Sequence, residues 1–360
     1  MPYGTVNADK MTTSDGVSSS GLYGFKNRIL NGQMAIDQRN AGASVTPANG
    51  ASTYTLDRWS FYVSQASKLT TQQSSTAPTG FVNSLLVTSS SAYSVGAGDI
   101  FEVRQFVEGY NTADLMWGTA NAQTVTLSFW VRSSLTGTFG GAIRNSASDR
   151  SYVFSYSISS ANTWEQKTVT ITGDTSGTWL TTTGRGIGIF FSLGAGSTAL
   201  KAAGSWGAGE YEGVTGQTNL VGTNGATFYI TGVQLEKGST ATSFDYRPYG
   251  TELALCQRYY MKFYPGAYGP LGIGVATSTT AVSTIIQLPV TFRTKPTGIT
   301  LAGEAFNATS GSPTGITYDQ ATVNAIMPYV NGTGFTSGNV VSIRGGGAGT
   351  TTLSIDGGEL

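Results

Sequence analysis

The segment that decides the fold is Gly225-Ala226-Thr227-Phe228-Tyr229-Ile230-Thr231-Gly232-Val233-Gln234-Leu235-Glu236-Lys237-Gly238. Phe228 and Ile230 point to one face of an extended strand, whereas Val233 and Leu235 have the opposite parity. A bulge at Thr231-Gly232 inserts one residue and returns all four apolar side chains to the same face. The segment therefore predicts a long, bulged strand that closes a packed β-sandwich.

The region from Phe25 to Tyr249 repeats short alternating segments separated by Gly, Ser, Thr, Asn and Asp, which is typical of an antiparallel sandwich. The clearest strand is 125–131, in which Val, Leu and Phe share one face and Trp130 lies on the other. Two sheets of about four strands are expected, with long polar connections at 66–80 and 194–224 as functional or interface loops. Further strands are predicted around 101–103, 152–158, 169–171 and 187–193.

Three further regions complete the predicted domain organisation. Residues 1–24 are small and polar, and we expect either a floppy arm or a peg that orders when docked to a larger assembly. Residues 250–260 form a short helical linker in which Thr251 caps and Leu253, Cys256 and Tyr260 recur at helical spacing. Residues 261–360 form a smaller C-terminal β domain, in which the alternation over 282–292 predicts a strand with Pro289 outward at an edge position.

The C-terminal domain has few large apolar residues for about 100 positions, so one copy would leave apolar surface exposed. We therefore expect an oligomer, with a homotrimer around a shared axis as the preferred geometry. The helical face of Leu253, Cys256 and Tyr260 is predicted to contribute the oligomer interface.

Composition excludes several classes of function. The 20 basic and 20 acidic residues give zero net charge without a basic cluster, so nucleic acid is not an expected partner. The absence of histidine removes Ser-His-Asp and Cys-His catalysis and His-ligated zinc. A single cysteine, Cys256, excludes an intramolecular disulfide. No apolar run reaches the length of a membrane span and no cleaved signal is evident, so a soluble chain without membrane insertion is expected.

Aromatic residues provide the candidate binding site. Sugars are bound by aromatic faces that cover their CH surfaces and by planar polar groups that satisfy their hydroxyls. Trp130 faces away from the core side of its strand, and Trp164, Trp179 and Trp206 lie in or beside loops, so these four are the candidate ligand-binding residues. The alternative is that each caps a sheet end or fills a subunit interface. Trp59 shares a face with Phe61 and Val63 and is expected in the core.

Several runs, in this order, resemble those of bacteriophage tail fibre and receptor-binding proteins that carry a carbohydrate-binding-module-like jelly roll. The resemblance spans roughly 25–260 and is weakest over 261–360. The matching runs are Asn27-Arg28-Ile29-Leu30-Asn31-Gly32, Tyr54-Thr55-Leu56-Asp57-Arg58-Trp59, Leu127-Ser128-Phe129-Trp130-Val131-Arg132, Asn162-Thr163-Trp164-Glu165, the closing strand 228–238, and Arg247–Tyr260 with its Cys-Gln-Arg-Tyr-Tyr end.

The resemblance implies an all-β jelly-roll sandwich in a virion protein, usually trimeric, with a role at the host surface. It implies that the N-terminal arm anchors the chain to other phage tail or capsid proteins, and that residues 261–360 form a distal head. Related modules often hold a structural calcium near an Asn-Gly opening. Here Asn31-Gly32 is present, but Thr231-Gly232 replaces the expected acidic pair, so no metal ligands are assigned and calcium stays an alternative that would use backbone carbonyls.

An enzyme is not expected, and no catalytic residue is assigned. A glycosidase needs only two carboxyl groups roughly 5 to 10 Å apart, but no spacing in the sequence selects a pair. The expected function is attachment to host cell-surface glycans by a short trimeric tail fibre. A capsid decoration protein of the same fold and a capsule-degrading glycosidase are the two alternatives. The carboxyl candidates for the second are Glu102, Glu108, Asp114, Glu165, Asp174, Glu210, Glu212 and Asp245.

Overall fold

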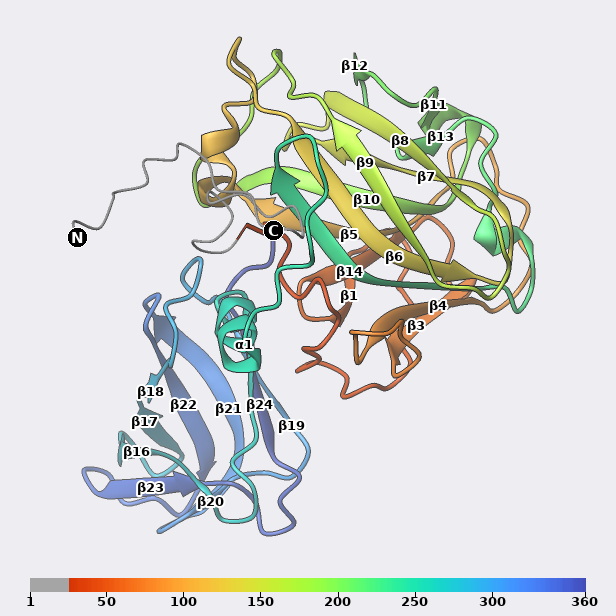
Figure 1. Cartoon of the computed structure of the whole chain (residues 1–360). Helices are drawn as coiled ribbons and strands as arrows, with labels where there is room; N and C mark the ends of the chain where they lie inside the picture. Colours follow the sequence, from red (N-terminus) through yellow and green to blue (C-terminus); the bar gives the residue numbers. More distant parts are fainter. Residues whose placement is uncertain (1–25) are drawn as a thin grey trace, which may run out of the picture. The chain divides into compact units, whose positions relative to one another are not determined.

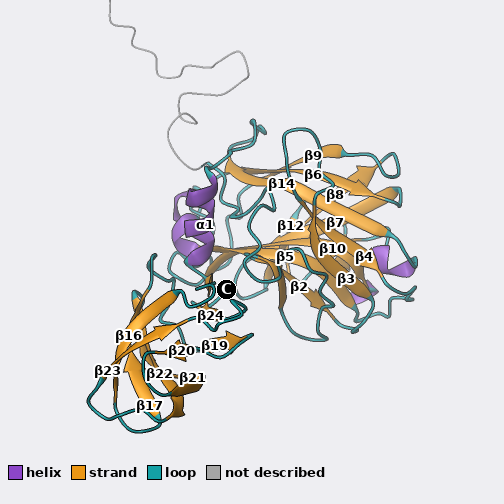
Figure 2. Cartoon of the chain, turned by 90° about the horizontal axis from the view of Figure 1, so that it is seen from below, coloured by secondary structure: helices purple, strands orange, loops and turns teal. Residues whose placement is uncertain are grey.

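The computed structural model describes residues 26–360, so the predicted N-terminal arm at 1–24 lies outside the described residues. The chain divides at Tyr249/Gly250 into two units, each built almost entirely of β-strands (Figures 1 and 2). The α-helix α1 (Tyr249–Gln257) begins at this division. The prediction of an all-β chain with antiparallel sheets and one short helix is confirmed.

The first unit contains two antiparallel sheets that enclose one core. The described strands pair in sheets of seven and five strands rather than about four each, and segments expected to be loops supply β3 and β12. Within the loop expected at 194–224, β11 (Leu200–Lys201) and β13 (Gly213–Val214) form a separate, small parallel pair. The larger sheet runs in the order β1 (Thr53–Leu56), β2 (Trp59–Val63), β5 (Ile100–Glu108), β10 (Arg185–Ala195), β7 (Gly137–Arg144), β8 (Arg150–Ile158) and β12 (Trp206–Ala208). The smaller sheet runs in the order β3 (Leu69–Ser74), β4 (Ser84–Ser89), β14 (Thr227–Lys237), β6 (Val125–Ser133) and β9 (Glu165–Ile171). Short 3-10 turns lie at Gly109–Asn111, Ala113–Leu115, Ser197–Ala199 and Leu220–Gly222.

The predicted bulge in the closing strand is present. The register between β14 and β6 shifts between Thr231 and Gln234, and Gly232 adopts a φ of 61°. Such a positive φ favours glycine because it has no Cβ to clash with the following carbonyl. Phe228, Ile230, Val233 and Leu235 consequently all lie in the same buried core. Trp59 is also fully buried, as expected, and its indole N–H donates to the carbonyl of Asn31 at 3.0 Å.

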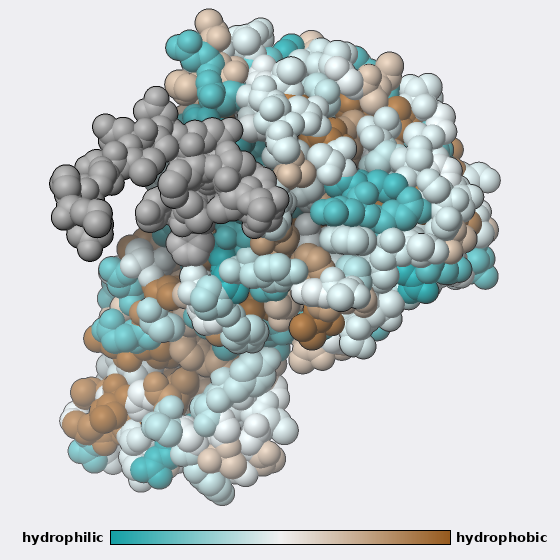
Figure 3. Space-filling model, viewed as in Figure 1, coloured by the Kyte–Doolittle hydropathy of each residue, from teal (hydrophilic) through white to brown (hydrophobic). Residues whose placement is uncertain are grey.

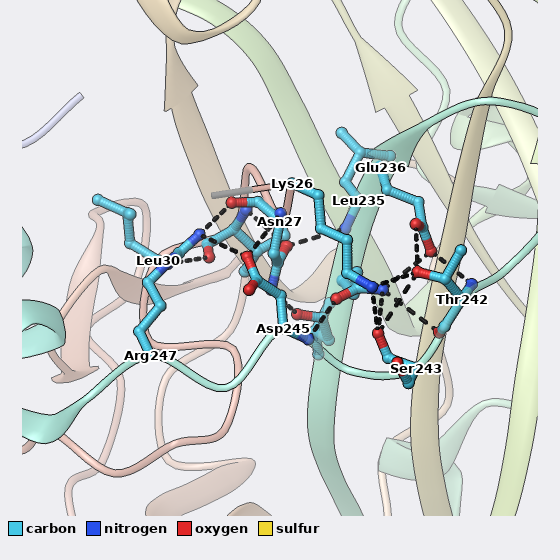
Figure 4. A network of polar contacts seen from close by, with 12 residues as sticks. Lys26, Asn27, Leu30, Leu235, Glu236, Thr242, Ser243, Asp245 and Arg247 are labelled. Atoms are coloured by element: carbon cyan, nitrogen blue, oxygen red, sulfur yellow. Dashed lines mark hydrogen bonds and ion pairs between the residues drawn. The ribbon is translucent and has the colours of Figure 1, made fainter. Parts of the chain in front are cut away.

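A polar network ties the start of the described chain to the segment that follows β14 (Figure 4). The buried Asn27 amide donates to the carbonyl of Val233 at 3.0 Å and accepts from the backbone N–H groups of Ile29 at 2.9 Å and Leu235 at 3.1 Å. Asp245 accepts from the Asn27 N–H at 3.1 Å. These bonds hold residues 242–245 over the outer face of the smaller sheet at Gln234 and Glu236, which are buried.

The second unit has its own core between two sheets. The smaller sheet runs in the order β15 (Tyr260–Phe263), β24 (Thr352–Asp356) and β19 (Ile299–Ala302). In the larger sheet, β21 (Ser312–Ala321) pairs with β22 (Ala325–Thr333), which is followed by β17 (Ala281–Thr284) with β18 (Ile286–Gln287), β16 (Pro270–Ala276), β23 (Val340–Arg344) and β20 (Asn307–Ala308). The single strand expected at 282–292 is wrong, because the run divides into β17 and β18 around an outward Ile285.

The helix differs from its prediction at both ends. It begins at Tyr249, so Thr251 lies within the first turn and is not the residue before it. It ends at Gln257, and Tyr260 is the first residue of β15, so Tyr260 does not share a helical face with Leu253 and Cys256. Cys256 is fully buried, whereas Leu253 and Tyr260 are half-buried. The oligomer interface assigned to these three residues stays a prediction.

Candidate binding surface

The outer face of the smaller sheet in the first unit carries a group of aromatic side chains. Tyr229 of β14 lies opposite Arg132 of β6, and Trp164 directly precedes β9, whose first residue pairs with the neighbour of Arg132. The rings of Trp164 and Tyr229 have centroids 6.1 Å apart at 66°. The guanidinium carbon of Arg132 lies 5.0 Å from the centre of the Tyr229 ring, and its Nε donates to the carbonyl of Asn162 at 2.8 Å. Arg132 is thereby fixed over Tyr229.

Three further rings gather beside this group. Phe81 precedes β4, and Phe244 and Tyr246 belong to the segment after β14. Their centroids are 5.1 Å apart for Phe81 and Phe244, 5.5 Å for Phe81 and Tyr246, and 4.9 Å for Phe244 and Tyr246. The Tyr246 hydroxyl donates to the carbonyl of Gly80 at 3.0 Å, and the residue is 53% exposed. Partial burial raises the pKa of Tyr246, so it stays a neutral donor at neutral pH.

Trp130 joins the two groups at the bulge. It lies opposite Thr231 in the ladder between β6 and β14. A Cβ atom at Gly232 would lie 2.6 Å from the Phe81 ring and 3.1 Å from the Trp130 ring, so both rings approach the same bare glycine. We call Phe81, Trp130, Trp164, Tyr229, Phe244 and Tyr246 the aromatic strip.

The indole N–H groups separate the six tryptophans into two classes. The N–H groups of Trp59, Trp117, Trp179 and Trp206 donate to backbone carbonyls. Within residues 26–360, neither Trp130 nor Trp164 makes such a bond, and both are half-buried. The two tryptophans of the aromatic strip therefore offer a donor and part of a ring face to a ligand.

The other two tryptophans predicted to bind ligand lie elsewhere. Trp179 and Trp206 pack edge-to-face with Trp117, with centroids 4.7 Å apart for Trp117 and Trp179, 5.3 Å for Trp117 and Trp206, and 5.4 Å for Trp179 and Trp206. We call these three residues the tryptophan triad. The cavity lined by Trp117 and Trp179 has a volume of about 20 Å³, which is the scale of one water molecule and not of a sugar ring. Ligand contact by Trp179 and Trp206 stays a prediction, and their geometry favours packing.

Strand β9, next to Trp130, carries polar side chains on both of its faces. Glu165 of β9 lies 2.6 Å from the Nζ of Lys167 and accepts from the backbone N–H groups of Ser159 at 2.8 Å and Ser160 at 2.9 Å. Burial alone would raise the pKa of Glu165, but the Lys167 and backbone hydrogen bonds outweigh it and lower the pKa. Gln166, opposite Trp130, is exposed. Glu165 has the parity of the core residue Val131, whereas Gln166 has the parity of Trp130, so of these two side chains the Gln166 amide lies beside the rings.

Sequence reasoning did not identify most of the aromatic strip. Tyr229 and Arg132 have the outward parity of their strands, so the alternation pattern contained the signal for both. Phe81, Phe244 and Tyr246 lie outside strands, where no period predicts the direction of a side chain. Their gathering depends on the bulge and on the return of the chain after β14.

Two of the carboxyl candidates meet on the opposite outer face of the sandwich, on the larger sheet. Glu102 and Glu212 are buried, with exposed fractions of 1% and 2%. Arg104 donates to Glu102 Oε1 at 2.9 Å, and Arg144 lies 2.6 Å from Glu212 Oε1. Burial, followed by the charge of Glu102 and a hydrogen bond with it, raises the pKa of Glu212 well above its ordinary value. The second oxygen of each carboxyl has no hydrogen-bond partner among the described residues, and we call Glu102 and Glu212 the acid pair.

Among the remaining carboxyl candidates, Asp114 and Asp174 serve as ion-pair partners. Asp114 Oδ2 lies 2.8 Å from Arg28, and Asp174 Oδ1 lies 2.7 Å from Arg150. The Asn27–Asp245 hydrogen bond holds a third candidate in the network of Figure 4.

The Asn31-Gly32 segment does not fit a calcium site. The Asn31 amide donates to the carbonyls of Ile36 at 2.8 Å and Asp57 at 2.9 Å, and the Gly32 carbonyl accepts from Val233 at 2.9 Å. Hydrogen bonds within the chain thus engage the backbone carbonyls that such a site would need. In the described part of the chain, no three or more His, Cys, Asp or Glu side chains gather as metal ligands. The described residues also include no helix with the length and apolar character needed to cross a bilayer.

Comparisons with known proteins give no family. No family model matches the chain, and no curated protein matches it. Similar solved structures include the enzymatically active domain of tailspike protein 4 of bacteriophage CBA120 (12% identity, 59% of this chain and 22% of that chain, TM-score 0.30). They also include a sugar-binding protein from Bacteroides thetaiotaomicron (12% identity, 59% and 100%, TM-score 0.36) and a family 22 carbohydrate-binding module from Clostridium thermocellum (12% identity, 54% and 100%, TM-score 0.29). With TM-scores below 0.5, these similarities identify neither a family nor a ligand.

Proposed function

We propose that this chain is a bacteriophage virion protein, a short trimeric tail fibre that attaches the particle to host-surface glycans through the aromatic strip and without catalysis. The observation that carries the proposal is the pair Trp130 and Trp164, whose indole N–H groups have no acceptor in the described chain while their rings lie on the outer face of one sheet. An aromatic face with free donors beside it provides both interactions that a sugar requires.

The polar neighbours match the hydroxyl groups of a sugar. Arg132 presents a guanidinium held over Tyr229, and Gln166 presents a free amide opposite Trp130.

The acid pair supports binding without turnover. Glycosidases hold their two carboxyl groups about 5 Å or more apart to admit a sugar or a water. Glu102 and Glu212 are almost completely buried, and each has an oxygen bound to an arginine. A substrate would first have to displace Arg144, which bridges Glu210 and Glu212 at 2.6 Å each.

The virion location, the homotrimer and the anchoring of the N-terminal arm to other phage tail or capsid proteins rest on the resemblance of the sequence runs given above. A shallow surface of this kind binds one sugar weakly, and three strips on one fibre raise the effective affinity through avidity. The same reasoning covers a capsid decoration protein, which differs in its position on the particle. Immunolabelling of the particle at the tail supports the fibre, whereas labelling on the shell supports the alternative.

A glycan array probed with the full chain tests the proposed function. The wild-type chain should bind a defined set of host glycans, and Trp130→Ala and Trp164→Ala should each lower the signal by tenfold or more. Trp179→Ala should keep the signal once the folded fraction is matched. Retention of binding in both strip variants would refute the site, and release of reducing ends from host polysaccharide would refute binding without catalysis.

A further inference from the structure

On the outward face of the larger sheet of the second unit, two adjacent rows of side chains contain no charged residue. Each row crosses five neighbouring strands, β23, β16, β17 with its extension, β22 and β21, and the register of the ladders places the members of a row side by side. We call the ten residues of the two rows the uncharged face. The rows are Val340, Val275, Ser283, Tyr329 and Thr317, and Ser342, Ile273, Ile285, Met327 and Gln320.

Four aliphatic residues on this face are strongly exposed. Ile273 is 69% exposed, Val340 68%, Ile285 54% and Val275 47%. Among the other isoleucine, leucine and valine residues that the structure describes, Val82 alone is as exposed as these four. Figure 3 shows a hydrophobic patch on the surface of this unit where β16 and β17 run. A contiguous exposed patch of this kind marks an interaction site in a soluble protein.

The face is hollowed on both sides of Ile285. One hollow of about 580 Å³ is lined by residues that include Tyr264, Leu271 and Ile285, and another of about 280 Å³ by residues that include Ile285, Gln320 and Met327. Side chains from a partner can enter such hollows, which increases the apolar area buried beyond that of a flat contact.

The two edges of the uncharged face carry opposite charges. Arg344 extends β23 beyond Ser342, and Asp319 lies at the register shift of β21 next to Gln320. Both residues are exposed, and neither makes an ion pair or hydrogen bond with its side chain inside the described chain. A copy of the same sheet, placed edge to edge, would bring Arg344 of one copy beside Asp319 of the next.

We propose that the uncharged face is where three copies of this chain pack around a common axis, with the β23 side of each face, beside which the short β20 lies, against the β21 side of its neighbour. This inference rests on the trimer of the proposed function and names its contact surface. A head-to-tail contact that repeats the same pair of edges closes into a ring of three when each copy is rotated by about 120° from the last. The occupant is a further copy of this chain because the two edges are complementary to each other, not to a charged partner.

The dimensions of the sheet fit three copies. Five strands about 4.8 Å apart span about 19 Å, and three such sheets arranged as a triangle lie about 5.5 Å from the axis. Two packed sheets usually lie about 10 Å apart, so each lies about 5 Å from the plane midway between them, which is close to the distance to the axis given above. The side chains of Val275, Ile273 and Ile285, near the middle of the sheet, would therefore fill the axis at normal packing density.

Light scattering on the full chain tests the proposal. Wild type should have three times the mass of one chain, and Ile273→Asp should reduce this to one, because it would place three charges at an apolar axis. Val82→Asp is the matched control, since Val82 is 77% exposed and lies in the first unit, and it should leave the mass unchanged. A wild-type monomer or dimer, or a trimer that survives Ile273→Asp, overturns the proposal.

The edge charges provide a second, independent measurement. Arg344→Asp alone and Asp319→Arg alone should each raise the concentration at which the trimer dissociates by about tenfold, and the double variant should restore it. A double variant as weak as the single ones contradicts the pairing. The Ile273→Asp chain should also keep the affinity of wild type for a soluble monovalent sugar while its signal on a dense glycan array falls. If the variant lost both the affinity for the soluble sugar and the array signal, the aromatic strip itself would have lost its ligand site. The experiment therefore distinguishes a wrong trimer surface from a wrong glycan site.

Discussion

Gly232 lies directly against the ring of Phe81, so that a Cβ atom at this position would come within 2.6 Å of the ring. Gly232→Ala therefore adds two costs, the strain of a φ of 61° and the displacement of Phe81. We expect a loss of about 2 kcal/mol in the free energy of unfolding by urea, and weaker glycan binding because Phe81 moves within the aromatic strip.

Gly225→Ala is the matched control for this change. Gly225 has a φ of 76°, but nothing lies within 4 Å of its Cβ position. It should lose only the strain, roughly 1 kcal/mol, and bind glycan as wild type does. Equal losses in both variants would show that Phe81 contributes nothing to the cost.

Trp206→Ala should lower stability without changing the ligand site. The side chain packs edge-to-face on Trp117, Trp179 and Tyr152, and its N–H donates to the carbonyl of Thr172 at 2.7 Å. Its removal should cost about 3 kcal/mol in the free energy of unfolding. Glycan binding measured per folded molecule should stay at the wild-type level. A loss of binding at full stability would instead make the tryptophan triad the ligand site.

The stability of the first unit should fall as the pH rises above the ordinary pKa of a glutamate, 4.5. The raised pKa of Glu212 means that the folded unit keeps a proton which the unfolded chain has already released. The unfolded state then binds fewer protons, so stability decreases by up to about 1.4 kcal/mol per pH unit until Glu212 itself ionises in the folded unit. The chain has no histidine, so few other groups titrate between pH 5 and 8.

Glu212→Gln should remove this dependence, since an amide donates to Glu102 without a proton that titrates. The measurement is the urea midpoint at several pH values from 5 to 8. Glu165→Gln is the control, because the pKa of Glu165 is lowered and its stabilisation is lost toward acid pH instead. A slope that is unchanged in Glu212→Gln would contradict a raised pKa of Glu212.

How far the sequence predicts this structure depends on whether the signal is local. The bulge at Thr231-Gly232 follows from the parity of four apolar residues in one strand, and the outward direction of Trp130 follows from the alternation of β6. The tryptophan triad and the acid pair join residues that are far apart in the chain, such as Glu102 and Glu212, and no period connects them. The same holds for Phe81 beside Phe244, which meet because the chain folds back after β14.

The network around Asn27 should be essential for the closing strand. Its buried side chain makes three hydrogen bonds to the backbone of Ile29, Val233 and Leu235, at the point where the bulge interrupts the ladder (Figure 4). Asn27→Ala leaves these groups without partners, so we expect a loss of about 3 kcal/mol in the free energy of unfolding. Asn121→Ala, at an exposed residue whose side chain makes no hydrogen bond within residues 26–360, should change it by less than about 0.5 kcal/mol. Hydrogen exchange should locate the weakened amides at Ile29 and Leu235, and a uniform change across the unit would contradict a local role.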